Sequence, residues 1–296
     1  MSRKTNTSHS HSKEKSTLII GIIVAFVLSI LLTLLTTMLA VYLGLFNTNS
    51  VIVSFNKVDY YHNVLEDFDK KAWDITIPLG LPKEVVTDLV EINKVSRDVK
   101  GSLMAGLDHT DYIPDTTDIE QDIDDRVRQY FADQGKALDA NQEKVLAEYK
   151  TIIAKDYLKS VEIPLIKYFG NLKNLYQKVM TAGIPICLIL SFVAITMIIK
   201  IQKWKHRGLR VITYSTLAAM VMTGLVPGII LISGIYKRLD LAPKYFYHFI
   251  MEYIKGGLQT FIYFSMVWFL VSVVLMLVCN NMKKKLIHKS YKGSRK

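Results

Sequence analysis

The sequence predicts an all-α integral membrane protein with four transmembrane helices and a helical extracytoplasmic domain inserted between the first two spans. Three observations predict this fold class. Four long apolar blocks contain no Asp, Glu, Lys or Arg, basic residues gather in three short polar segments, and the one long polar segment has apolar residues at helical spacing. Half of the 296 residues are hydrophobic and the mean hydropathy is +0.23, which is high for a soluble globular protein.

Each apolar block reaches the roughly 20 residues that a helix needs to cross a bilayer. The blocks are residues 17–46, 179–199, 211–236 and 257–280. The first is too long for the apolar region of a signal peptide, roughly 7–15 residues, and no small-x-small cleavage site follows it. We therefore expect an uncleaved signal anchor.

The distribution of charge predicts the orientation. The loop 200–210 and the tail 281–296 are basic and contain no acidic residue, and the segment 1–16 has a single Glu among its basic residues. The segment 47–178 instead has 23 acidic residues against 17 basic ones. Because basic residues gather on the cytoplasmic side, both termini are expected in the cytoplasm and residues 47–178 outside the plasma membrane.

These observations divide the chain into nine predicted segments. They are a disordered basic cytoplasmic tail (1–16), the signal anchor (17–46), an extracytoplasmic helical domain (47–178), the second span (179–199), a basic cytoplasmic loop (200–210), the third span (211–236), an interfacial outer loop (237–256), the fourth span (257–280) and a basic cytoplasmic tail (281–296).

The net charge of +11 does not predict nucleic-acid binding, because the excess lies in the juxtamembrane segments and no nucleic-acid motif accompanies it. Such clusters attract anionic lipid at the cytoplasmic face. The two cysteines, Cys187 and Cys279, lie in different spans, and the outer segment has no cysteine and no glycosylation sequon. A bacterial membrane is the home that this composition favours.

The outer segment is expected to contain four or five helices. Apolar residues at spacings of three and four predict helices at 57–72, 83–104, 118–133, 140–159 and from Leu165 into the second span. Pro164 is expected to start or kink the last of these. Residues 73–82 read as an extended linker, and 50–55 as a possible strand without a visible partner.

The acidic stretch at 115–125 has two interpretations. Thr117 and Glu120 match the capping box at the start of a helix. A divalent-cation site, with Asp115, Asp118 and Asp122 as weak candidate ligands, is less favoured because the stretch lacks the central Gly of an EF-hand loop.

The strongest catalytic candidate is the group Asp108, His109 and Asp111, which could serve as a base or as metal ligands. No second His lies nearby, and no hydrolase, zinc or phosphate-loop motif occurs. We therefore predict no enzyme, no cofactor and no metal, with these residues as weak metal candidates.

The outer loop 237–256 and the residue before it combine aromatic and basic side chains, which suits a short interfacial helix. The aromatic belt of a membrane protein and a docking site for a partner protein or lipid both remain open. The interface candidates are Tyr236, Arg238, Tyr245, Phe246, Tyr247, Phe249 and Tyr253.

The function expected from the sequence is a non-enzymatic scaffold, accessory or sensor subunit whose outer domain binds a partner protein or ligand. The partner is expected to be another membrane or envelope protein, or a second copy. In the alternative, a transporter or channel subunit, the third span lines a pathway through its hydroxyl-bearing stripe, which includes Thr213, Ser215 and Thr216. Helix packing is the favoured interpretation of that stripe.

Overall fold

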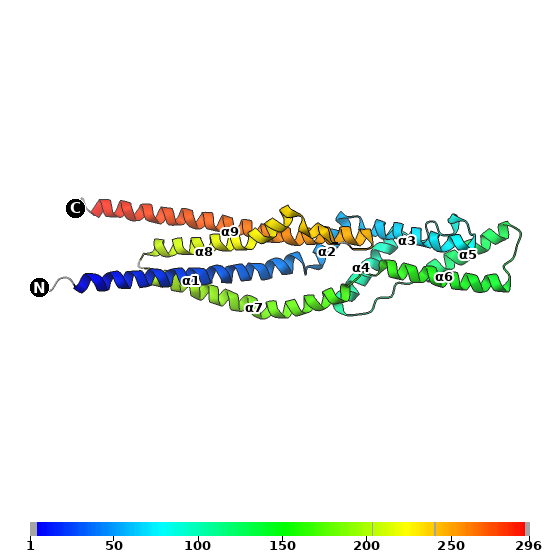
Figure 1. The fold of residues 1–296 in the computed structure, drawn as a ribbon, viewed down its shortest axis with the longest axis horizontal. Coiled ribbons are helices and arrows are strands. Elements are labelled where there is room, and N and C mark those ends of the chain that lie inside the picture. The colour runs from blue at the N-terminus through cyan, green and yellow to red at the C-terminus, as the bar shows by residue number, and fades with distance from the viewer. Residues whose placement is uncertain (1–4, 203, 240, 294–296) are drawn as a thin grey trace. The chain divides into compact units, whose positions relative to one another are not determined.

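A computed structural model describes residues 5–202, 204–239 and 241–293, and within these residues the chain is all-helical with no strand (Figure 1). The α-helices are α1 (Thr5–Gly44), α2 (Thr48–Lys57), α3 (Tyr60–Thr76), α4 (Ile92–Asp108), α5 (Thr117–Asp133), α6 (Ala140–Val161), α7 (Ile166–Ile201), α8 (Lys205–Ser233) and α9 (Lys244–Gly293). Three short 3₁₀ helices span Ile77–Leu79, Lys83–Val85 and Ile235–Arg238.

Four helices of the described chain are long and apolar enough to cross a membrane, as the sequence predicts. They lie at Ile19–Gly44, within Ala140–Ile201, at Lys205–Ser233 and at Lys244–Lys284. In the second of these ranges the apolar part is the C-terminal half of α7, because α6 is charged along its length.

The chain divides into two compact units. The first contains Met1–Val51, Tyr176–Leu239 and Met251–Lys296, and the second contains Ile52–Leu175 with Asp240–Ile250.

Apolar packing and hydroxyl groups together hold the first unit. Its core includes Leu28 and Leu32 of α1, Ile198 of α7, and Ile212 and Ala219 of α8. These side chains are aliphatic and small enough for the helices to approach closely.

Hydrogen bonds between helices complete this packing. Ser215 Oγ donates to the Ala25 carbonyl at 2.9 Å, and Ser272 Oγ donates to Thr216 Oγ1 at 2.8 Å. Trp268 Nε1 donates to Thr36 Oγ1 at 2.7 Å. The hydroxyl stripe of α8 therefore takes part in helix contacts, as the packing interpretation expects.

The second unit is a bundle in which α3 packs on α4 and α6, and α6 packs on α5 (Figure 1). Each helix has a buried stripe at a spacing of three or four residues. These stripes are Tyr60, Val64, Phe68 and Ala72 on α3; Val95, Val99 and Leu103 on α4; Ile119, Ile123 and Val127 on α5; and Leu146, Tyr149, Ile153 and Tyr157 on α6.

Two assignments near the start of this unit were wrong. Residues 50–55 lie in α2, not in a strand, and α3 continues to Thr76 into the segment expected to be an extended linker. The end of α3 is held because the Thr76 hydroxyl contacts both the Ala72 carbonyl at 2.6 Å and Tyr149 Oη at 2.7 Å. Gly80, at φ 66°, then reverses the chain after one 3₁₀ turn.

The helix expected at 83–104 begins only at Ile92. Val85 is buried at the end of the 3₁₀ helix, and Val86, Leu89 and Val90 are buried from the turn that follows it, with Asp88 at φ 53°. The apolar series that predicted helices at 57–72 and 140–159 are only partly buried. Phe68 of α3 and Tyr149 and Tyr157 of α6 are buried as expected. On α3, Tyr60 and Val64 take the inward positions expected of Tyr61 and Leu65. On α6, Val145 and Ile152 are exposed where burial was expected.

The predicted interfacial helix of 237–256 is not a separate element. A 3₁₀ turn at Ile235–Arg238 precedes α9, which begins at Lys244 and continues without a break to Gly293. Gly257 lies inside this helix. A Cβ at this position would come within 2.4 Å of Leu45 Cδ2, so the glycine allows α9 to pack closely on the C-terminal end of α1.

Candidate functional site

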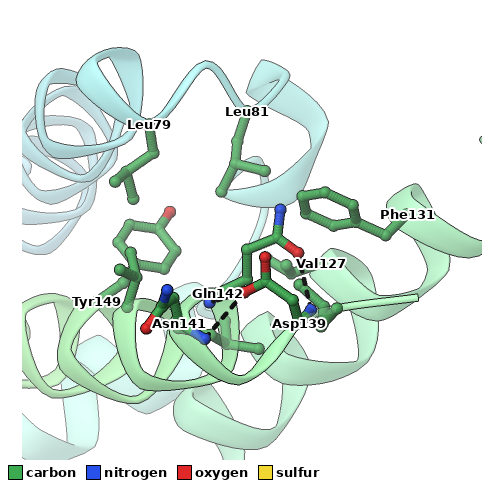
Figure 2. A pocket seen from close by; sticks show the side chains of 11 residues that line it. Leu79, Leu81, Val127, Phe131, Asp139, Asn141, Gln142 and Tyr149 are labelled. Atoms are coloured by element: carbon green, nitrogen blue, oxygen red, sulfur yellow. Dashed lines mark hydrogen bonds between the residues drawn. The ribbon is translucent and has the colours of Figure 1, made fainter. Parts of the chain in front are cut away.

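A mainly apolar pocket of about 240 Å³ lies in the second unit, which we call the helical unit. It lies between α5, α6 and the turn that follows α3 (Figure 2). Its lining residues are Leu79, Leu81, Val127, Phe131, Leu138, Asp139, Asn141, Gln142, Val145, Leu146 and Tyr149. Most are aliphatic or aromatic, and the polar ones all belong to the start of α6.

Two elements form the walls of the pocket. Leu79 and Leu81 belong to the turn around Gly80, and Leu146 and Tyr149 belong to α6 (Figure 2). The Thr76–Tyr149 hydrogen bond ties the end of α3 to α6. The turn is thus fixed above α6 at a distance that leaves room for a side chain.

A capping box forms the polar rim. Asp139 Oδ1 accepts hydrogen bonds from the backbone N–H groups of Asn141 and Gln142, both at 2.8 Å, and the Asp139 N–H donates to Gln142 Oε1 at 2.9 Å. This capping box was not predicted from the sequence, although Asp139 followed three residues later by Gln142 is its signal.

Ion pairs brace α5 against α6 beside the pocket. Arg128 contacts both carboxylate oxygens of Glu143, at 2.7 and 2.8 Å, and Asp124 at 2.6 Å. Lys150 contacts the other oxygen of Asp124 at 2.6 Å. The hydrogen bond from Arg128, followed by that from Lys150, lowers the pKa of Asp124 below its ordinary value.

The acidic stretch begins α5, as expected, but the predicted capping box is wrong. Thr116 is the N-cap and its side chain makes no capping bond. Asp115 Oδ1 instead accepts from the Thr117 N–H at 3.0 Å, and its hydrogen bonds with Thr117 lower the pKa of Asp115. An Asx-type turn takes the place of the Thr–Glu pair.

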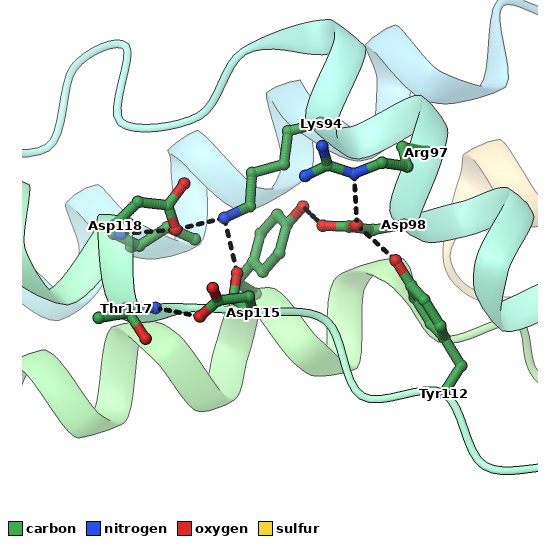
Figure 3. A network of polar contacts seen from close by, with 9 residues as sticks. Lys94, Arg97, Asp98, Tyr112, Asp115, Thr117 and Asp118 are labelled. Carbon is green, nitrogen blue, oxygen red and sulfur yellow. Dashed lines mark hydrogen bonds and ion pairs between the residues drawn. The ribbon is translucent and has the colours of Figure 1, made fainter.

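Basic residues surround the weak candidate cation ligands. Lys94 Nζ donates to the Asp115 carbonyl at 2.6 Å and pairs with the Asp118 carboxylate (Figure 3). Asp122 pairs with Arg126 at 2.8 Å. Among the residues that the structure describes, no group of three or more His, Cys, Asp or Glu side chains could hold a metal ion.

A buried carboxylate next to this stretch was not singled out from the sequence. Asp98 of α4 is 1% exposed and accepts hydrogen bonds from Tyr157 Oη at 2.6 Å and Tyr112 Oη at 2.8 Å (Figure 3). Gly101 makes room for the Tyr112 ring, since a Cβ there would lie 2.4 Å from Tyr112 Cζ. Burial, and then Asp98, raise the pKa of Tyr112.

The group Asp108, His109 and Asp111 does not converge on one site. Asp108 ends α4 and His109 is its left-handed C-cap at φ 56°. Asp111 is exposed and lies 3.9 Å from Lys167, on the wall of a second cavity of about 250 Å³ that Tyr112 and Glu162 also line. His109 does not line that cavity.

The interface candidates of the aromatic segment divide into two sets. Phe246, Phe249 and Tyr253 are buried, and the Phe249 ring lies 4.4 Å from Phe55 and 5.6 Å from Tyr60. Tyr245 also stacks edge-on against Tyr60, at 5.3 Å. Tyr236, with Lys237 over its ring, Arg238 and Tyr247 keep exposed surface.

Comparison of the chain with models of protein families, with curated proteins and with solved structures finds no match in any of the three. The function is therefore argued from the residues of the chain itself.

Proposed function

We propose that the chain is a non-enzymatic multi-pass membrane protein whose extracytoplasmic helical domain binds a partner protein. It would serve as a scaffold, accessory or sensor subunit of a complex in the bacterial envelope. The mainly apolar pocket between α5, α6 and the turn after α3 is the observation that carries the proposal.

The membrane arrangement rests on charge and hydropathy. The chain has four apolar helices, and its basic segments at 1–16, 200–210 and 281–296 all fall on the same predicted side. The positive-inside rule then puts the tails in the cytoplasm, where they meet anionic lipid, and residues 47–178 outside. This topology leaves the helical unit as the main surface for recognition.

The volume of the pocket favours a protein partner over a small molecule. Small-molecule sites commonly reach roughly 300–1,000 Å³, whereas this pocket has about 240 Å³. A single apolar or aromatic side chain fits that space, and such anchors in desolvated pockets supply much of the binding energy of protein interfaces. The polar rim at Asp139, Asn141 and Gln142 would meet the backbone around the anchor.

The transport alternative gains no comparable observation. Ser215, Thr216 and Thr213 of α8 are buried among neighbouring helices, and the first two bond to α1 and α9. Their hydroxyls are thus engaged in packing within a single copy.

A photocrosslinking pair on α6 tests the proposal. Val145 lines the pocket and is 47% exposed, whereas Ile152, seven residues on, is 49% exposed and lies outside the pocket lining. With a photoreactive amino acid at each position of the full chain in native membranes, we expect one specific protein adduct from position 145 and a much weaker one from position 152. Equal labelling at both positions, or no protein adduct at 145, would contradict the proposal.

A further inference from the structure

The start of α9 packs on the helical unit through aromatic side chains. Phe246 and Phe249 are buried, and the Phe249 ring lies 4.4 Å from the ring of Phe55 on α2. The Tyr245 ring meets Tyr60 of α3 edge-on, at 5.3 Å. All five residues belong to the helical unit. We name Tyr245, Phe246 and Phe249 the α9 clasp.

Two carboxylates on neighbouring helices lie close to the α9 clasp. Asp67 belongs to α3 and Asp156 to α6, two helices that pack on each other, and the charges of both carboxylates act on Tyr245. Lys71 Nζ lies 2.7 Å from Asp67 Oδ2, an ion pair whose geometry is not that of a hydrogen bond. Asp156 Oδ2 is shielded from solvent and has no hydrogen-bond partner within the described part of the chain. One lysine thus serves two carboxylates, and Asp156 is the less well compensated of them.

The surroundings of Asp156 disfavour its ionised form. Burial is the largest cause that raises the pKa of Asp156 above its ordinary value. The positive charge of Lys71 opposes this shift, the negative charge of Asp67 adds to it, and Lys159 of the same helix opposes it. Since water favours the ionised form of a carboxylate, an opening of the unit that hydrates Asp156 is easier when this group is charged.

We propose that Asp156 makes the α9 clasp a pH-sensitive switch, which acid tightens and neutral pH loosens. With Asp156 protonated, the start of α9 stays packed on α2 and α3. With Asp156 ionised, local opening that exposes this carboxylate to water becomes more frequent. The switch requires neither the proposed partner nor the membrane arrangement, because all of its residues belong to one compact unit.

The raised pKa sets the direction of the switch. Well below the ordinary pKa of 3.8, Asp156 is protonated whether the clasp is closed or open, and the closed clasp has its full stability. That stability is lost as the pH rises through the higher pKa of the closed state.

Hydrogen exchange of the backbone amides of residues 245–250 tests the switch in the full-length, detergent-solubilised chain. Protection factors between pH 4 and pH 8, corrected for the intrinsic dependence of exchange on pH, report how often the clasp opens. We expect protection several-fold higher in acid than at neutral pH. Asp156→Asn should give high protection across the whole range. Asp69→Asn is the matched control, because it removes a carboxylate of α3 that faces Asp88 instead, and it should keep the pH dependence.

Two further variants should move the midpoint of the pH dependence in opposite directions. Asp67→Asn removes a like charge and frees Lys71 for Asp156, so the midpoint should fall to lower pH. Lys71→Gln removes the compensating charge, so the midpoint should rise.

Three results would overturn the proposal. They are protection factors that do not change with pH, a pH dependence that survives Asp156→Asn, and midpoints that Asp67→Asn and Lys71→Gln leave in place. Protection of α4 and α6 in the same experiment shows that each variant is folded.

Discussion

At the scale of the residue, the buried carboxylate of Asp98 connects separate segments of the helical unit. It is 1% exposed and accepts hydrogen bonds from tyrosines of the α4–α5 loop and of α6. Burying a charge is costly unless its oxygens have donors. Asp98 thus links three segments at a point where each oxygen has a partner.

Replacing Asp98 with Ala should destabilise the protein strongly. The Tyr157 hydroxyl would lose its acceptor in a buried site, and an unsatisfied buried donor costs about 1–3 kcal/mol, with the lost charge-assisted bonds adding a similar amount. We expect a loss of about 3 kcal/mol in the free energy of unfolding, measured by chemical denaturation of the detergent-solubilised chain. Asp111→Ala, at a carboxylate 91% exposed, is the control and should leave that value unchanged.

For Asp69 of α3, in contrast to Asp98, replacing the carboxylate is expected to raise the stability of the protein. Burial, followed by the charge of Asp88, raises the pKa of Asp69, whereas Lys83 and His62 partly offset this and Glu66 adds to it. Its Oδ1 is buried and has no hydrogen-bond partner among the residues that the structure describes. The ionised group is therefore less favourable in the folded chain than in the unfolded one.

Asp69→Asn should raise stability at neutral pH and lose this advantage in acid. The pKa of Asp69 in the folded chain lies above its unfolded value near 3.8. Above the folded pKa, the ionised carboxylate therefore destabilises the native chain. Well below 3.8, the carboxyl group is protonated in both states and has no such effect. Thermal unfolding of both proteins between pH 3 and pH 7 measures this difference. A variant that is less stable at pH 7, or one whose advantage persists unchanged in acid, would show that the carboxylate is not held unfavourably; the exposed Asp133→Asn should show neither effect.

At the scale of the element, α5 and α6 differ in how their first turns are capped. α5 and α6 both begin where acidic residues gather, yet only α6 has a capping box, at Asp139 and Gln142. At α5 the bond that matters is from Thr117 N–H to Asp115, and the N-cap Thr116 makes none. The N-termini of these two helices are therefore capped in different ways.

Asp139→Ala should cost about 1 kcal/mol in the free energy of unfolding, the typical loss on removing an N-cap side chain. Thr116→Ala occupies the equivalent position of α5 and should cost far less, because no capping bond is lost. Equal losses in chemical denaturation would contradict the difference between the two caps.

The helices themselves were predictable from apolar spacing, whereas their phase was not. The series Ile119, Ile123 and Val127 identified both α5 and its buried face. On α3 and α6 either of two adjacent apolar stripes fits a helix, and only the tertiary neighbours decide that Tyr60 and Leu146, not Tyr61 and Val145, face inward. The turn at 86–91 escaped prediction because Val85 and Leu89 have the spacing of a helical face that continues through Ile92.

The pocket could not be predicted from the sequence for a related reason. It depends on the meeting of Leu79 and Leu81, in a turn, with α6 residues some 65 positions further along the chain. Asp98 was overlooked because one acidic residue within an amphipathic helix resembles its solvated neighbours. Its burial follows from Tyr112 and Tyr157, which come from other elements.

At the scale of the whole molecule, we propose that four apolar helices cross a membrane with both ends of the chain on one side and the helical unit on the other. The basic residues of 1–16 and 281–296 and the acidic excess of 47–178 all favour this arrangement. The pocket acquires its proposed role from this arrangement, because it would then face the extracytoplasmic space.

The most direct test is labelling of single cysteines on intact cells with a membrane-impermeant maleimide. In the Cys187→Ser and Cys279→Ser background, Asp133→Cys reports the helical unit, and Ser12→Cys and Ser290→Cys report the two ends. We predict labelling of Asp133→Cys on intact cells and labelling of the other two only after lysis. Labelling of either end on intact cells, or protection of Asp133→Cys until lysis, would contradict the proposed topology.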